Sequence, residues 1–238
     1  MRFALYFAPD DSSAWRDFGA LWLGRDAATG SDVDQAAIDG VDAHTFRALT
    51  AAPRRYGFHA TLKAPFALAT GATKAALAKE LARFCAARLP LQMPPLEVAR
   101  LDDFLALVPV ARETRINELA ADCVRAFDSF RAAPEPEEIE RRRRKGLSTR
   151  QDRYLIEWGY PYVLADYRFH MTLTGGLDGV SPHHVAAVLA AARTMLAGLA
   201  GEPLWLDAIC LFDEPDEASP FRLVARFPLG RTSVMRRG

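Results

Sequence analysis

Long apolar stretches and an excess of charge of either sign are both missing from this sequence. The 238 residues include 30 basic and 30 acidic side chains, so net charge gives no reason to expect a nucleic-acid coat protein or a membrane-surface binder. Charged residues interrupt every apolar stretch well before the roughly 18 residues that a membrane span requires, and the apolar start at 3–8 is too short for a signal peptide. We therefore expect a cytoplasmic protein without a membrane partner.

Cysteine is also scarce. The three cysteines, at positions 85, 123 and 210, are far apart and embedded in apolar segments, which is typical of reduced core thiols. No metal-ligand spacing appears elsewhere, because the adjacent His183 and His184 diverge by about 100° on a helix. We expect neither a metal nor a cofactor.

Two segments about 110 residues apart repeat one pattern. Tyr-Gly-Phe-His-Ala-Thr-Leu at 56–62 aligns with Tyr-Arg-Phe-His-Met-Thr-Leu at 167–173, and each copy begins the order strand, helix, strand, strand. The repeat predicts a single α+β domain over 1–238 with two pseudo-symmetric lobes, at about 1–112 and 161–238. Each lobe is expected to be an antiparallel sheet with helices on its outer face, and the two enclose a central groove. A helical insertion is expected at about 113–160.

Strand alternation divides each repeat into an apolar face and a polar face. The polar faces are predicted to line the groove; they carry His59, Thr61 and Lys63 in the first copy and Arg168, His170, Thr172 and Thr174 in the second. A neutral and a protonated imidazole can together move a proton to and from a phosphate ester, while threonine hydroxyls stabilise its oxygens. We therefore predict His59 and His170 as an acid–base pair with Thr61 and Thr172 as donors.

Basic side chains beside the motifs are candidates for holding the phosphate. Lys63 and Arg168 share the polar strand faces, Thr174 extends the second one, and Arg54 and Arg55 directly precede the first strand. Taken alone, one His-x-Thr segment is more often a structural polar pair than a site. Two copies at equivalent positions of a repeat favour catalysis, although the symmetry leaves open which histidine is the acid and which the base.

Other polar features have simpler interpretations. Tyr56 and Tyr167 fall on the apolar face and are expected to serve packing, and His44 is expected at the surface or in a helix cap. Within the charged insertion 135–153, the segment 135–145 places Glu137 and Glu138 four residues before arginines and is predicted to be a solvated, self-paired helix. The alternative is a lid over the groove, with contacts from Lys145, Arg150, Arg153 and Tyr154.

The paired segments His59-Ala60-Thr61-Leu62 and His170-Met171-Thr172-Leu173 resemble the two-histidine, LigT-like phosphoesterase superfamily. Within it, the sequence Arg-Arg-Tyr-Gly-Phe-His-Ala-Thr-Leu-Lys-Ala-Pro-Phe at 54–66 is similar to a branch that accompanies phosphonate-degradation genes. The resemblance implies a bilobal fold and metal-independent opening of a cyclic phosphate. For that branch it implies a ribose cyclic phosphate as substrate, and the long insertion at 113–160 departs from the compact RNA enzymes.

The sequence thus predicts a cyclic phosphodiesterase, a hydrolase acting on a small-molecule phosphate ester such as a ribose cyclic phosphate or a nucleotide. Two alternatives stay open. The groove could bind a nucleotide or RNA end without turnover, or the protein could be an RNA-directed 2′,3′-cyclic phosphodiesterase or ligase-type enzyme. Nucleic acid is not favoured as partner, because the chain carries no net positive charge.

Overall fold

A seven-stranded antiparallel sheet organises the protein. The computed structural model describes residues 1–144, 146–217 and 219–230. In the order in which they lie side by side, the strands are β4 (Leu96–Leu101), β5 (Phe104–Pro109), β6 (Met171–Thr172), β2 (Ala60–Phe66), β1 (Arg2–Phe7), β8 (Ala208–Glu214) and β9 (Arg222–Pro228). Two short strands, β3 (Leu91–Gln92) and β7 (Trp205–Leu206), form a separate pair.

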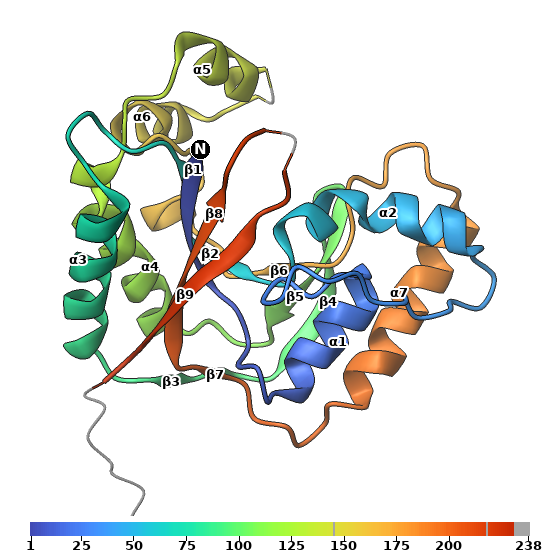
Figure 1. Cartoon of the computed structure of the whole chain (residues 1–238). Helices are drawn as coiled ribbons and strands as arrows, with labels where there is room; N and C mark the ends of the chain where they lie inside the picture. Colours follow the sequence, from blue (N-terminus) through green and yellow to red (C-terminus); the bar gives the residue numbers. More distant parts are fainter. Residues whose placement is uncertain (145, 218, 231–238) are drawn as a thin grey trace, which may run out of the picture.

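Helices flank this sheet and complete the α+β architecture that the sequence predicts. Within the described ranges they are α1 (Ala14–Leu23), α2 (Ala43–Tyr56), α3 (Lys74–Ala86), α4 (Thr114–Ala126), α5 (Pro136–Arg143), α6 (Thr149–Trp158) and α7 (Pro182–Ala197), with short 3-10 turns η1 (Asp128–Phe130) and η2 (Leu164–Asp166). Figure 1 shows α3 and α4 beside one half of the sheet, and α1, α2 and α7 beside the other. None of the described helices combines the length and apolarity needed to cross a membrane.

Local sequence signals fix where the helices begin and end. Ser13 caps α1 by accepting a hydrogen bond from the Trp15 amide, and Gly24 ends that helix in the left-handed conformation at φ 70°. Ser181 caps α7 by accepting a hydrogen bond from the His184 amide, and Pro182 occupies the first helical position, where no backbone donor is needed. Because each cap satisfies backbone groups that a helix end leaves open, these boundaries follow from the sequence.

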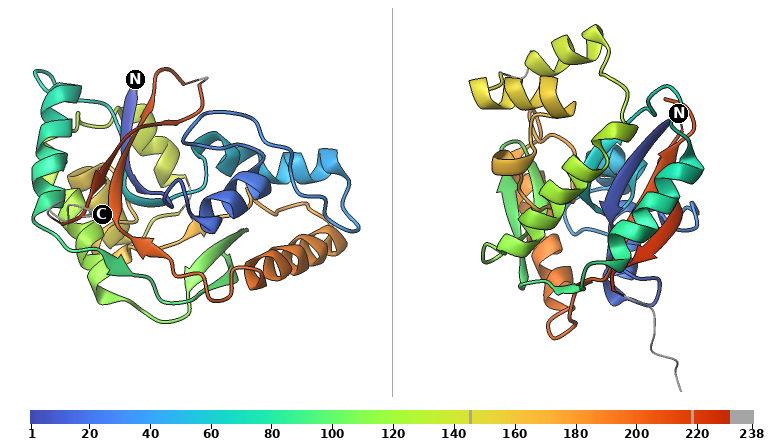
Figure 2. Two further views of the ribbon diagram at one scale, coloured as in Figure 1. Left: turned by 60° about the horizontal axis from the view of Figure 1, so that its bottom comes forward. Right: turned by 90° about the vertical axis from the view of Figure 1, so that its left-hand side faces the viewer.

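Strands from the two halves of the chain alternate within the one sheet, instead of forming the two facing sheets expected. β6, from the second half, lies between β5 and β2, and β8 pairs directly with β1. Both views in Figure 2 show β8 and β9, drawn in red, beside the N-terminal strand. The two histidine motifs consequently lie on adjacent strands of one sheet.

The main core fills one face of β1 and β2. Phe3, Leu5 and Phe7 point from β1 into the same cluster as Leu77 of α3 and Cys123 of α4. The other face of β1 carries Ala4 and Tyr6, which belong to a smaller cluster with Cys210, Phe212 and Phe221. All three cysteines are buried and free, in agreement with the sequence prediction of core thiols.

Candidate functional site

The two histidine motifs meet at one antiparallel pairing. Ala60 of β2 pairs with Met171 of β6, and both side chains are fully buried in the main core. Neighbouring residues in an extended strand point to the opposite face, so the side chains on either side of this pair share the other face of the sheet. The residues next to this pair are therefore also opposite each other: His59 lies opposite Thr172, and Thr61 lies opposite His170.

Both imidazoles are held in the same way. The Nδ1–H group of His59 donates to the carbonyl of Gly57 at 2.8 Å, and that of His170 donates to the carbonyl of Arg168 at 2.8 Å. Because a carbonyl can only accept, this contact assigns the proton to Nδ1 and leaves Nε2 as an acceptor. The Thr61 hydroxyl oxygen lies 3.4 Å from Nε2 of His59, so the free ring nitrogen faces the threonine of its own motif.

The surroundings keep both histidines neutral. Burial lowers the pKa of His59 to about 4, and the nearby His170 contributes in the same direction. Burial also lowers the pKa of His170. Tyr6 covers one face of the His59 ring, with the ring centroids 3.8 Å apart. At neutral pH the site therefore presents two uncharged Nε2 acceptors and two threonine hydroxyls.

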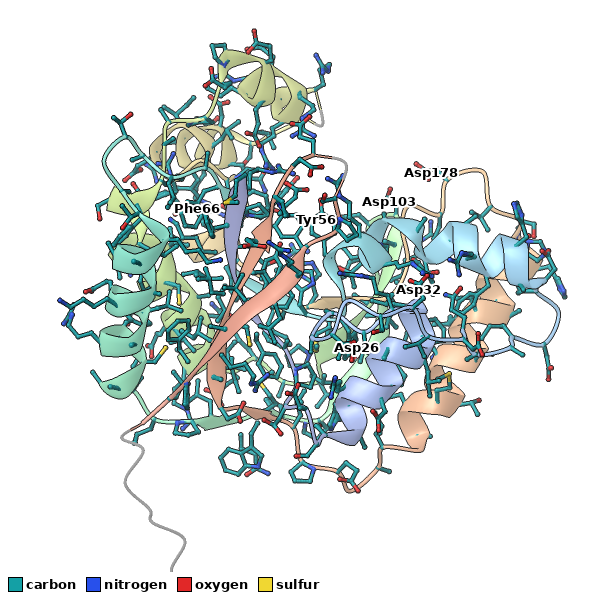
Figure 3. All side chains as sticks on the ribbon, viewed as in Figure 1. Asp26, Asp32, Tyr56, Phe66, Asp103 and Asp178 are labelled. Atoms are coloured by element: carbon teal, nitrogen blue, oxygen red, sulfur yellow. The ribbon has the colours of Figure 1, made fainter. Side chains whose placement is uncertain are left out.

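An aromatic wall that the sequence does not predict lies beside His59. Tyr6 is almost fully buried and packs against Phe212 and Phe221, with centroids 5.1 and 6.1 Å away. Tyr56, labelled in Figure 3, stacks on Phe221 at 5.0 Å and lies 6.0 Å from His59. The segment 3–7 is otherwise apolar, and Tyr6 differs from its neighbours only by its hydroxyl group. The sequence therefore gives little indication that Tyr6 contacts a histidine.

Lys63 does not lie beside the histidines, although alternation predicted it there. Tyr6 pairs with Thr61, but Leu5 pairs with Lys63, so β2 holds one extra residue at Leu62. Such a bulge breaks strict alternation and turns the next side chain to the face of Leu5. Lys63 is buried there, where its Nζ donates to the Val124 carbonyl at 3.0 Å.

Thr174 is likewise a structural residue. It is fully buried, and its hydroxyl accepts a hydrogen bond from the Leu105 amide at 2.9 Å. The Thr174 amide in turn donates to the Leu105 carbonyl at 3.2 Å. The hydroxyl thus anchors the end of β6 to β5 and is unavailable to a ligand.

The three arginines predicted as phosphate contacts have different positions. Arg54 forms an ion pair with Asp32 at 2.6 Å, and Arg55 forms one with the buried Glu214. Their charge is therefore partly neutralised by chain segments far away in the sequence. Arg168 is exposed, and its carbonyl holds His170.

The charged insertion forms α5 and α6 on top of the sheet in Figure 1. No residue of α5 is buried, and Glu138 pairs with Arg142 at 2.7 Å, which confirms a solvated helix with internal pairing. The same Arg142 lies over the ring of Tyr160 at 4.8 Å. Arg150 pairs with Asp166 at 2.7 Å, and Lys145 lies outside the described residues.

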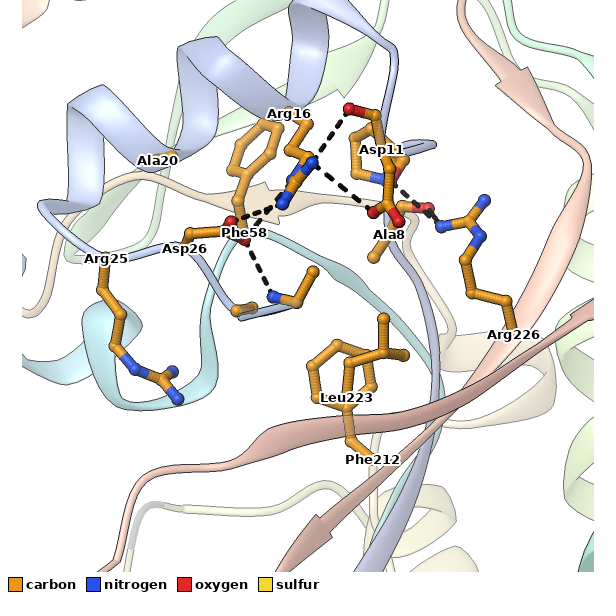
Figure 4. A pocket seen from close by; sticks show the side chains of 13 residues that line it. Ala8, Asp11, Arg16, Ala20, Arg25, Asp26, Phe58, Phe212, Leu223 and Arg226 are labelled. Carbon is orange, nitrogen blue, oxygen red and sulfur yellow. Dashed lines mark hydrogen bonds and ion pairs between the residues drawn. The ribbon is translucent and has the colours of Figure 1, made fainter. Parts of the chain in front are cut away.

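A separate pocket lies between α1 and the strands β8 and β9 (Figure 4). Its internal volume is about 20 Å³, which is room for about one water molecule. An ion pair between Arg16 and Asp26 at 2.5 Å occupies its rim. The pocket is therefore too small to hold a substrate.

Comparison with known proteins gives one family and two close relatives. A family described as "Protein of unknown function (DUF1045)" matches residues 61–222. A protein of Janthinobacterium sp. (strain Marseille) is 41% identical over 228 residues, which are 95% of this chain and 50% of the relative. A protein of Laribacter hongkongensis (strain HLHK9) is 40% identical over 224 residues, 94% of this chain and again 50% of the relative.

Both relatives are named ribose 1,5-bisphosphate phosphokinase PhnN, and this chain spans about half their length. A kinase transfers a phosphoryl group and does not hydrolyse a cyclic ester. The names therefore contradict the prediction of a cyclic phosphodiesterase and of a hydrolase. The part of the prediction that agrees with them is a small phosphorylated ribose as ligand.

Proposed function

The chain belongs to the family described as protein of unknown function DUF1045, and on the geometry of its two histidine motifs we propose that it binds a phosphorylated ribose. The observation that carries the proposal is the meeting of both motifs at the pairing of Ala60 with Met171. This register gathers two imidazoles and two hydroxyls on one face of the sheet. The names of the relatives supply the ligand class.

The arrangement suits a phosphate group that carries or exchanges a proton. Each Nε2 accepts a proton from the ligand or from solvent, since each Nδ1–H is already committed to a carbonyl. Once protonated, an imidazolium donates a charge-assisted hydrogen bond to a phosphate oxygen, and the threonine hydroxyls add neutral ones. Binding would thus transfer protons to His59 and His170, whose pKa values burial lowers in the free protein.

We further propose that the sugar of a bound ribose phosphate lies against the aromatic side chains beside His59. Tyr56 is partly exposed and lies 6.0 Å from His59, so its ring offers a surface on which a sugar ring can rest. The same symmetry supports placing the fold with the two-histidine superfamily. In both motifs the histidine Nδ1 donates to the carbonyl two residues earlier, as expected of two copies of one unit.

Calorimetric titration tests the proposal. Ribose 5-phosphate and ribose 1,5-bisphosphate should bind the wild type, and His59→Ala and His170→Ala should each weaken binding by about 10-fold, the value of one charge-assisted hydrogen bond. His44→Ala is the matched control, because His44 is exposed on α2. Unchanged affinity in both site variants would reject the ribose-phosphate site. Adding ATP to the same samples shows whether this chain alone transfers a phosphoryl group.

A further inference from the structure

A second recess lies between the start of α4 and the segment 165–169, next to His170 in the chain. Its volume is about 300 Å³, which is far larger than the pocket of Figure 4 and sufficient for a phosphate group with part of a sugar. Arg112, Glu113 and Asn117 line it from one side, and Tyr167 and Arg168 line it from the other.

The charge of this recess is positive. Arg112 and Arg168 are exposed, and in the part of the chain that the structure describes neither guanidinium forms an ion pair with a carboxylate. The one carboxylate of the lining, Glu113, accepts from Arg115 at 3.2 and 3.3 Å. Two guanidinium groups are thus left to face whatever occupies the recess, and guanidinium is well matched to phosphate oxygens.

The remaining lining adds no further charged donor. Tyr167 contributes its ring, and its hydroxyl is inaccessible to solvent. The first turn of α4 borders the recess, and the Glu113 side chain caps it by accepting a hydrogen bond from the Arg115 amide at 3.0 Å. The two guanidinium groups are therefore the charged groups that would hold an anion here.

Arg168 connects the recess to the histidines. Phe169 and Met171 are buried in the core, so alternation places Arg168 on the same side of the strand as His170. Residues two apart in an extended strand are separated by roughly 7 Å. A five-membered sugar with phosphates at opposite ends is of this size.

We propose that the recess lined by Arg112 and Arg168 is a second phosphate-binding subsite, which takes the second phosphate of a bisphosphorylated ribose. The inference rests on the proposed ribose-phosphate site, with one phosphate at the histidines and the other at the arginines. A bisphosphate should therefore bind more tightly than a monophosphate.

The test compares ribose 5-phosphate, ribose 1,5-bisphosphate and inorganic phosphate as calorimetric ligands. Arg112→Gln should weaken bisphosphate binding by about 10-fold and leave the monophosphate nearly unchanged, so that the preference for two phosphates disappears. Arg125→Gln is the matched control, because Arg125 is exposed near the other end of α4.

A bisphosphate preference that survives in Arg112→Gln would overturn the subsite. Failure of the histidine site gives a different result, because His59→Ala and His170→Ala would then leave monophosphate binding unchanged. Inorganic phosphate shows whether the recess binds a phosphate group that is not attached to a sugar. If it binds the double histidine variant and Arg112→Gln abolishes that binding, the recess is a phosphate site in its own right.

Discussion

Burial of His59 in its neutral form should make the protein lose stability in mild acid. The pKa of His59 is about 4 in the folded chain and 6.5 in the absence of burial, so the unfolded state binds more protons between these values. The contribution is fully present above pH 6.5 and is lost as the pH falls towards 4. Linkage between these two pKa values gives a loss of about 2 kcal/mol on going from pH 7.5 to pH 5.

The assay is urea unfolding at pH 7.5 and pH 5 of wild type, His59→Gln and the control His44→Gln. The free energy of unfolding should fall by up to about 2 kcal/mol more in wild type and in the control than in His59→Gln. Each protein is compared with itself at the two pH values, so lost stacking on Tyr6 cancels. An equal fall in His59→Gln and wild type would refute the burial of a neutral imidazole.

Further predictions concern the residues that shape the site. Gly57 has φ 78° and ψ 174°, a conformation suited to glycine, and a Cβ there would overlap Ala27; Gly57→Ala should therefore cost at least about 2 kcal/mol in thermal unfolding. Gly71 also has a positive φ, 84°, but a Cβ there would meet no other atom, so Gly71→Ala should lower stability less than Gly57→Ala does. An equal loss of stability in the two variants would show that the overlap with Ala27 is unimportant. Thr174→Val should destabilise by about 1–3 kcal/mol because the Leu105 amide loses its acceptor, whereas Thr172→Val should spare stability and weaken ribose-phosphate binding; the reverse pattern would contradict the assignment. Binding of ribose 5-phosphate should strengthen from pH 8 to pH 6 with proton uptake, measured in buffers of different ionisation enthalpy, and the double histidine variant should show only the uptake of the ligand itself.

The grouping of the histidines with their threonines could be predicted from sequence, because it depends only on the alternation of side chains along a strand. Alternation placed His59 with Thr61 and His170 with Thr172, and the pairing of Ala60 with Met171 agrees with that placement. The rule fails one residue later, because the bulge at Leu62 depends on how β2 meets β1 and leaves no mark in the strand itself.

Long-range partners account for the other differences. The ion pair between Arg55 and Glu214 joins residues 159 positions apart, and Thr174 meets Leu105 across 69 positions. Neither contact is encoded in a local pattern, and the local pattern alone predicts that an arginine beside a motif contacts the ligand. The reaction class was also beyond the motif, because two histidines on one strand face suit several kinds of phosphate chemistry.

The ribose-phosphate site is tested most directly by the affinity of wild type, His59→Ala, His170→Ala and His44→Ala for ribose 5-phosphate, measured by calorimetry at pH 7. The wild type and His44→Ala should bind alike, and each site variant should bind about 10-fold more weakly. Equal affinity in all four proteins, or no binding to any of them, would contradict a ribose-phosphate site at the paired histidines.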